Sequence, residues 1–166
     1  TLSAGARHEW RHAPLESSAS KGATVARGTA AWRFNQNVSL RAAGATSHRW
    51  PTLNELARDF SAGSTTTAAN ADLAPERARS VEGGIDVTAH RQQLTVTMFR
   101  SVVHDAIANV TVPSPAGTII RQRRNAGDAH SAGVEIDSEL KAAMFRLRTS
   151  LTFLSAHFRK SLEAPL

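Results

Sequence analysis

The feature that most constrains this chain is a regular alternation of apolar and polar residues over long segments. In residues 37–47, for example, Val38, Leu40 and Ala42 alternate with polar residues. Because successive side chains of a strand point to opposite sides, this pattern predicts a strand with one apolar and one polar face. The segments span about 10 to 13 residues, against the usual 5 or 6 in soluble sheets. A tilted strand needs about 9 to 11 residues to cross a bilayer.

The alternation recurs from one end of the chain to the other. It predicts an all-β fold, an antiparallel up-and-down meander of about seven or eight long strands. After Met98 the strict alternation is lost, which predicts a bulge near the end of that strand. The expected strands cover residues 1–12, where the alternation is weak, and residues 23–34, 37–47, 80–90, 94–98, 134–141 and 145–153.

The connections between these strands fall into two length classes. Short turns are expected at Asn35–Asn37, His90–Gln92 and Ala142–Ala143, and long connections at Gly44–Ala78 and Asn109–His130. In a meander, alternate connections lie at the same end of the sheet, so short and long connections are sorted to opposite ends. Outer-membrane barrels have this arrangement. The pattern therefore predicts a transmembrane β-barrel.

The first long connection contains a helix signal. Thr52 and Glu55 have the spacing of a capping box, and Leu53, Leu56 and Phe60 are spaced to form one face of a short helix.

In the last expected hairpin, acidic residues of one strand and arginines of the next share the polar face. Pairing between them would chiefly fix the register, since exposed ion pairs stabilise little.

Composition limits the chemistry further. The chain has no cysteine, so it has neither disulfides nor thiolate metal ligands, and its net charge is +6. Arg121, Arg123 and Arg124 form the densest basic cluster, but no aromatic residues are interleaved with them, so we expect no nucleic-acid partner. Anionic lipopolysaccharide and an anionic chelate both remain open as partners of these arginines.

Two motifs suggest enzyme chemistry. Residues His8–His12 read H-E-W-R-H, which matches the zincin motif, but that motif requires a helix. In the strand expected here the two histidines lie about 13 Å apart and cannot share a metal ion. His104 and Asp105 suggest a hydrolase pair, but adjacent strand residues point to opposite faces and no G-x-S-x-G elbow is present. We expect no enzyme activity, no cofactor and no metal site.

Four blocks of the sequence follow one another in a fixed order: P-T-L-N-E-L, N-A-D-L-A-P-E, F-R-S-V-V-H-D-A-I and N-A-G-D-A-H-S-A-G-V-E. In this order and spacing they resemble the C-terminal part of the barrel of TonB-dependent outer-membrane receptors. Ala57 and Ala71 depart from the family pattern, and tyrosine is absent. The matching positions are Pro51–Leu56, Asn70, Leu73, Pro75, Glu76, Glu82, Gly84, Phe99, Asp105, Ile107, Asn125, Gly127, Ala129, Gly133, Val134 and Glu135.

The resemblance implies a function for the parent protein. Such receptors import a metal chelate, of the ferric siderophore or cobalamin type, across the outer membrane of Gram-negative bacteria. Their barrel has 22 strands and encloses a plug domain that contacts TonB. The expected strands are far fewer than 22 and the plug is not among these residues, so the resemblance implies a fragment. Residues 1–166 would form a single partial barrel domain, a sector of a transmembrane β-barrel. Its expected partners are outer-membrane lipid, lipopolysaccharide and the chelate. The alternative interpretation is a soluble or surface β-sandwich that acts as a binding module. The candidate ligand contacts in the long loops are Arg49, Trp50, Asn54, Arg58, Arg121 and Arg123.

Overall fold

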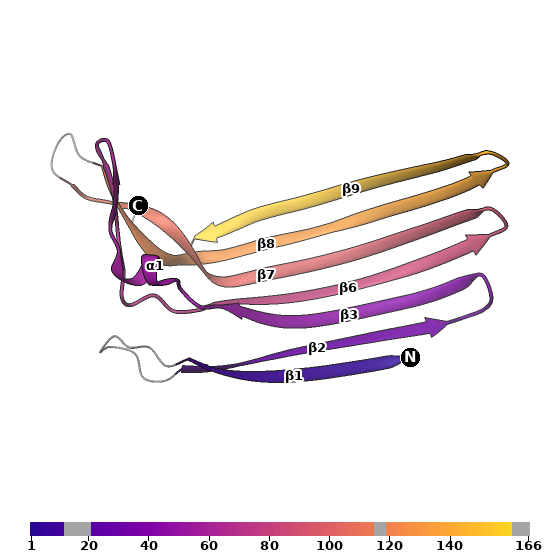
Figure 1. Ribbon diagram of the computed structural model, residues 1–166, viewed down its shortest axis with the longest axis horizontal. Coiled ribbons are helices and arrows are strands. Elements are labelled where there is room, and N and C mark those ends of the chain that lie inside the picture. Colours follow the sequence, from indigo (N-terminus) through magenta and orange to yellow (C-terminus); the bar gives the residue numbers. More distant parts are fainter. Residues whose placement is uncertain (12–20, 115–118, 161–166) are drawn as a thin grey trace.

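The protein is a single curved sheet with a small cap of loops at one end (Figure 1). A computed structural model describes residues 1–11, 21–114 and 119–160. No helix in these ranges is long and apolar enough to cross a membrane. The elements are β1 (Leu2–Arg11), β2 (Lys21–Arg33), β3 (Val38–Arg49), α1 (Leu53–Ala57), β4 (Phe60–Ala62), β5 (Thr65–Ala68), β6 (Glu76–Ala89), β7 (Gln92–Val112), β8 (Ile119–Ala142) and β9 (Phe145–Lys160).

Seven long strands lie side by side in the order β1-β2-β3-β6-β7-β8-β9, each antiparallel to its neighbours (Figure 1). This arrangement confirms the predicted all-β meander. Every strand in the described ranges belongs to this one sheet, which is not closed into a barrel. The sandwich interpretation is therefore wrong, because a sandwich needs a second sheet packed on the first.

The register places apolar side chains in continuous rows on one face of the sheet. Leu40, Ile85, Val96, Ile136 and Leu151 are direct cross-strand partners in one such row. We call this the outward face. Many of its large residues are exposed, among them Met98, Leu147 and Phe153 at more than 60 %. A contiguous apolar surface of this extent indicates contact with another apolar phase.

The opposite face, called the inward face, is polar and cross-linked by ion pairs toward the turn end, whereas Phe99, Leu154 and Phe158 lie on it toward the loop end. Arg41 lies 3.6 Å from Asp86, and its guanidinium also donates to the Thr97 hydroxyl. Near the short turn of the last hairpin, Glu139 accepts a hydrogen bond from Arg148 at 2.7 Å. The predicted pairing of acidic and basic residues across this hairpin is thus confirmed.

The short turns between β2 and β3, β6 and β7, and β8 and β9 all lie at one end of the sheet, the turn end (Figure 1). The connection formed by residues 50–75 lies at the opposite end, the loop end.

One prediction about the loop end is wrong. Residues Asn109–His130 were predicted to be a long connection, but they are mostly strand, because β7 continues to Val112 and β8 begins at Ile119. Residues 121–125 of β8 read R-Q-R-R-N and are polar at every position, so no alternation of apolar and polar residues marked them as a strand.

The predicted bulge is present in β7. The register with β8 shifts between Val103 and Ala106, and Asp105 has a left-handed backbone with φ of 57°. A bulge adds a residue to one strand and increases the local twist. Beyond it, the tips of β7 and β8 turn toward the loops rather than continuing the plane of the sheet (Figure 1).

Gly133 is required by a close contact inside the sheet. It lies opposite Phe99, and a Cβ placed on it would be 2.5 Å from the Phe153 carbonyl oxygen and 2.7 Å from the Phe99 ring. We expect Gly133→Ala to destabilise the sheet by about 1 to 3 kcal/mol, the usual cost of overpacking. Gly44→Ala is the matched control, because its nearest neighbour lies at 3.7 Å. Urea unfolding in detergent micelles measures both, and equal midpoints would contradict the steric account.

Candidate functional site

The first long connection begins with a capped helix. The Thr52 amide donates to Oε2 of Glu55 at 2.7 Å, and the Glu55 amide donates to the Thr52 hydroxyl at 3.3 Å. This reciprocal pair satisfies amides that a helix N-terminus leaves free, which confirms the predicted capping box. The helix is shorter than predicted, however. It ends at Ala57, Phe60 lies in β4, and Leu53 is 58 % exposed, so the expected three-residue apolar face does not form.

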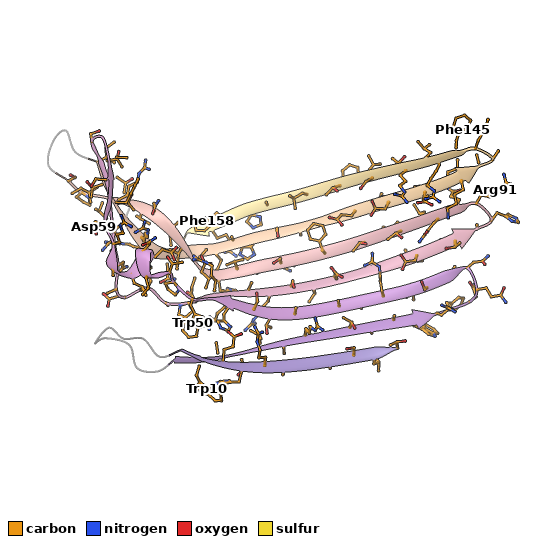
Figure 2. The ribbon with its side chains drawn as sticks, viewed as in Figure 1. Trp10, Trp50, Asp59, Arg91, Phe145 and Phe158 are labelled. Atoms are coloured by element: carbon orange, nitrogen blue, oxygen red, sulfur yellow. The ribbon has the colours of Figure 1, made fainter. Side chains whose placement is uncertain are left out.

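The rest of the connection folds back onto the extended β7–β8 hairpin. Strands β4 and β5 form a small hairpin, and β5 pairs in parallel with Ile119–Gln122 of β8. Residues 50–75 and the hairpin tips 105–112 and 119–127 therefore form one unit, which we call the loop platform. In Figure 2 it lies at the end of the sheet that carries Trp50 and Asp59, opposite Phe145 and Arg91.

Two asparagines anchor the platform. The Asn125 amide nitrogen donates to the carbonyls of Ala74 at 3.0 Å and Asp105 at 2.6 Å, and its oxygen accepts from the Ala74 amide at 2.9 Å. Asn70 donates from its side chain to the Arg123 carbonyl at 2.9 Å. Leu73 lies between these anchors and is 6 % exposed. The second and fourth sequence blocks thus meet in space and hold the loop on the hairpin.

A second cluster fixes both ends of the connection to the sheet. Nε of Arg49 donates to Oε2 of Glu76 at 2.6 Å, and Nη1 of Arg49 lies 3.0 Å from Oε2 of Glu55. The other Glu76 oxygen accepts from the Ile107 amide at 2.6 Å. Glu76 therefore bridges the last residue of β3 and the residue that follows the β7 bulge.

Arg123 connects the hairpin to the helix. Its Nη1 donates to the carbonyls of Asn54 at 3.0 Å and Arg58 at 3.1 Å, near the C-terminal end of α1. A cation at this position also offsets the negative end of the helix dipole. Arg123 thus has a positioning role in the platform.

The six predicted ligand contacts all lie on or beside the platform, but in different environments. Arg49 and Arg123 are held by the contacts above. Trp50 is half-buried and packs edge-on against the His48 ring at 5.3 Å. In the described part of the chain, the exposed side chains of Asn54, Arg58 and Arg121 have no hydrogen-bond or ion-pair partner. Contact of these six residues with a ligand stays a prediction.

The described histidines of the enzyme-like motifs, His8 and His104, lie in strands. His8 is in β1, where its Nδ1 lies 2.7 Å from the Thr24 hydroxyl; His12 lies outside the described residues. Nδ1 of His104 is 3.1 Å from Asp128, whereas Asp105 pairs with Arg77 at 2.7 Å. His104 and Asp105 therefore do not form a pair with each other. The described ranges contain no group of three or more His, Asp or Glu residues placed to hold a metal ion.

Sequence reasoning did not foresee the bridging role of Glu76 or the anchoring role of Asn125. Glu76 and Asn125 both stand in the four ordered blocks of the sequence, which singled out these two positions but did not reveal the groups that they contact. The expected strand began at residue 80, so the sequence did not place Glu76 at the start of β6. Its partners, Arg49 and Ile107, are 27 and 31 residues away and could not be read from spacing.

The Glu55 cap predicts a pH dependence. Burial alone would raise the pKa of Glu55, but hydrogen bonds from the Thr52 amide and the Arg49 guanidinium outweigh it and hold the pKa below the ordinary value of 4.5. The stabilisation is therefore complete above about pH 4.5 and is lost as the pH falls below it. We expect the emission of Trp50, measured with Trp10 and Trp32 replaced by Phe, to shift below that pH. In Glu55→Gln this shift should be absent; an unchanged acid transition would contradict the assignment.

Comparison with known proteins decides the family. The family described as "TonB dependent receptor-like, beta-barrel" matches residues 1–163. The chain belongs to this family. Among curated proteins, no sequence matches the chain. The TonB-dependent receptor family consists of receptors and transporters rather than enzymes, in agreement with the prediction that the chain is not an enzyme.

Solved structures of a siderophore receptor, an iron transporter and a copper transporter share the fold. The siderophore receptor PirA from Pseudomonas aeruginosa has a TM-score of 0.70 at 19 % identity, over 84 % of this chain and 29 % of that one. The FrpB iron transporter from Neisseria meningitidis (F5-1 variant) has a TM-score of 0.70 at 16 % identity, over 98 % and 24 %. The copper transporter OprC has a TM-score of 0.69 at 16 % identity, over 93 % and 26 %. The chain thus spans about a quarter of the length of these receptors.

Proposed function

We propose that this chain forms seven neighbouring strands of a TonB-dependent receptor barrel in the outer membrane of a Gram-negative bacterium. The observation that carries the proposal is the family match together with the faces of the sheet. The outward face exposes apolar rows, and the inward face carries the Arg41 and Glu139 ion pairs. In such barrels the apolar side faces lipid and the polar side faces the lumen.

The loop platform is then extracellular and borders the mouth of the lumen. In outer-membrane barrels the longer connections lie outside the cell and the short turns lie in the periplasm. Trp32, Phe34 and Phe145, which flank the short turns and are at least 63 % exposed, are suited to the periplasmic interface. The free side chains of Asn54, Arg58 and Arg121 are the proposed ligand contacts on the platform.

The proposed cargo is a metal chelate, of the ferric siderophore or cobalamin type. The iron and siderophore receptors among the similar structures support this cargo class, and the arginines of the platform suit an anionic chelate. Coupling to TonB is proposed to run through a plug domain, which is not part of these 166 residues.

Two experiments test the proposal. The refolded chain is expected to need detergent micelles and to aggregate without them, and a clean soluble monomer in plain buffer would overturn the membrane assignment.

The second experiment tests the proposed cargo. The gene that contains this sequence is deleted, and uptake of labelled ferric siderophores and of cobalamin is compared with the parent strain. Loss of one uptake identifies the cargo; unchanged uptake of both would contradict the proposed cargo class.

A further inference from the structure

The pairing between β2 and β3 stops before either strand ends. Their ladder joins Arg27–Arg33 to Ser39–Ala45. Toward the loop end, β2 stays paired with β1 as far as Lys21 and β3 stays paired with β6 as far as Arg49, but β2 and β3 are not paired with each other there. The sheet therefore divides into the part from β3 to β9 and a two-stranded ribbon. We call residues 6–11 and 21–26 the free ribbon.

Two glycines face each other where the division begins. Gly28 and Gly44 are cross-strand partners, one pair before the ladder ends. A Cβ on either residue would have its nearest neighbour at 3.7 Å or more, so neither glycine is needed to avoid a clash. Glycine instead gives the backbone more freedom and leaves no side chains to pack across the pair. The Gly28–Gly44 pair is therefore suited to be a hinge between the free ribbon and β3.

Side chains, rather than a ladder, hold the free ribbon against β3. The Thr46 hydroxyl accepts a hydrogen bond from the Ala26 amide at 2.9 Å and donates to the Ala26 carbonyl at 3.5 Å. The His48 side chain is only 5 % exposed, and its Nε2 lies 3.2 Å from Oε2 of Glu9, at ion-pair distance but without an aligned hydrogen bond. Among the described residues, these are the polar contacts that join the free ribbon to the rest of the sheet. We call the contacts of Thr46 and His48 the latch.

The contact between Glu9 and His48 shows that the free ribbon has turned relative to β3. Counted from the ladder, Glu9 is at an inward position and His48 is at an outward one. In a continuous sheet their side chains would point to opposite faces. They meet because the free ribbon twists about its own axis beyond the hinge, and two-stranded ribbons twist more strongly than wide sheets. Arg7 holds the other Glu9 oxygen, so the ribbon presents a fixed carboxylate to His48.

We propose that the free ribbon is a hinged flap, which the latch holds closed. Because no ladder joins the ribbon to β3, opening it breaks the contacts of Thr46 and His48 but no strand pair. An element held by so few contacts opens at a low free energy while the rest of the sheet stays folded. Opening moves the loop ends of two strands away from β3 and so widens the mouth of the barrel. That consequence rests on the proposed function, whereas the hinge and the latch do not.

The test measures the distance between two nitroxide labels by pulsed electron paramagnetic resonance, on the full chain in detergent micelles. The chain has no cysteine, so one label is placed at Trp10→Cys on the free ribbon and the other at Asn109→Cys on β7. Both side chains are exposed, and Trp10 lies toward the loop end (Figure 2). The labelled parent should show one main distance.

The latch variant carries Thr46→Val and His48→Ala in this labelled background. Its ratio of closed to open molecules should fall about 25-fold, at about fivefold for each lost contact, so that a second, longer distance appears. The control makes the same two exchanges at exposed residues of β9, as Thr149→Val and His157→Ala, and should keep the distance of the parent. An unchanged single distance in the latch variant, or an equal second distance in the control, would overturn the proposal.

The hinge is tested by adding Gly28→Ala and Gly44→Ala to the latch variant. The spread of the second distance should narrow, because alanine restricts the backbone more than glycine does. If the latch variant does not fold by circular dichroism, Thr46→Val and His48→Ala are measured singly, and each should change the ratio about fivefold. A chain that is a soluble monomer without micelles would overturn the membrane placement, and the same labels would then test the flap in buffer.

Discussion

Replacing Asn125 by alanine is expected to detach residues 70–75 from the β7–β8 hairpin. The substitution removes three hydrogen bonds and leaves the Ala74 amide and two carbonyls without partners in a half-buried site. Net losses of about 1 kcal/mol per bond give a cost of about 3 kcal/mol to loop docking. Amide exchange within residues 70–75, where Pro75 has no amide proton, should then be roughly 100-fold faster, because local opening sets the exchange rate.

Asn109→Ala provides the matched control for this prediction. Asn109 lies on β7 of the same hairpin, and its side chain is exposed without a hydrogen bond in the described part of the chain. Its removal should change exchange of residues 70–75 by less than about twofold, the size expected for a surface substitution. Equal acceleration by both variants would mean that strand stability, not the Asn125 anchor, holds the loop.

The strands near the turn end could be predicted from the sequence because one face of each strand is apolar and the other is polar. Leu40, Ile85 and Val96 alternate with Arg41, Asp86 and Thr97, so periodicity marked each strand and its faces. The same reasoning failed for residues Asn109–His130. There Arg123 contacts the carbonyl at Asn54 and Asn125 contacts Ala74, so neither side of the hairpin is uniformly apolar. Pro113 indicated a turn, but it did not indicate that β7 would continue up to the residue before it.

Local motifs in the loop platform could be predicted from the sequence, whereas contacts between residues far apart in the sequence could not. The capping box of Thr52 and Glu55 depends on a spacing of three residues, which the sequence displays directly. Arg123 was predicted as a ligand contact, which stays a prediction. Its hydrogen bonds to carbonyls 69 and 65 residues away could not be read from spacing. An arginine in a loop has the same sequence signature whether it binds a ligand or supports a helix.

Replacing Glu76 by glutamine is expected to loosen both ends of the first long connection. One Glu76 oxygen accepts from Arg49 and the other from the Ile107 amide, each at 2.6 Å. Glutamine keeps one acceptor but turns an amide donor toward the other partner and removes the charge. With only 15 % of the Glu76 side chain exposed, losing a charge-assisted hydrogen bond should cost about 2 kcal/mol. Exchange of the Ile107 amide should rise by about tenfold or more.

Glu82→Gln is the control, since Glu82 is on the same strand but is 49 % exposed and lies 3.9 Å from Arg41. An ion pair so exposed should contribute less than about 0.5 kcal/mol. A double-mutant cycle with Arg49→Gln then separates the two partners of Glu76. If Arg49, Glu76 and the Ile107 amide act as one unit, adding Arg49→Gln to Glu76→Gln should lower the stability of the connection little further. Exchange of the Ile107 amide should stay fast in the double variant. Fully additive losses would show that Arg49 is held mainly by Glu55, and that Glu76 acts only through the β7 bulge.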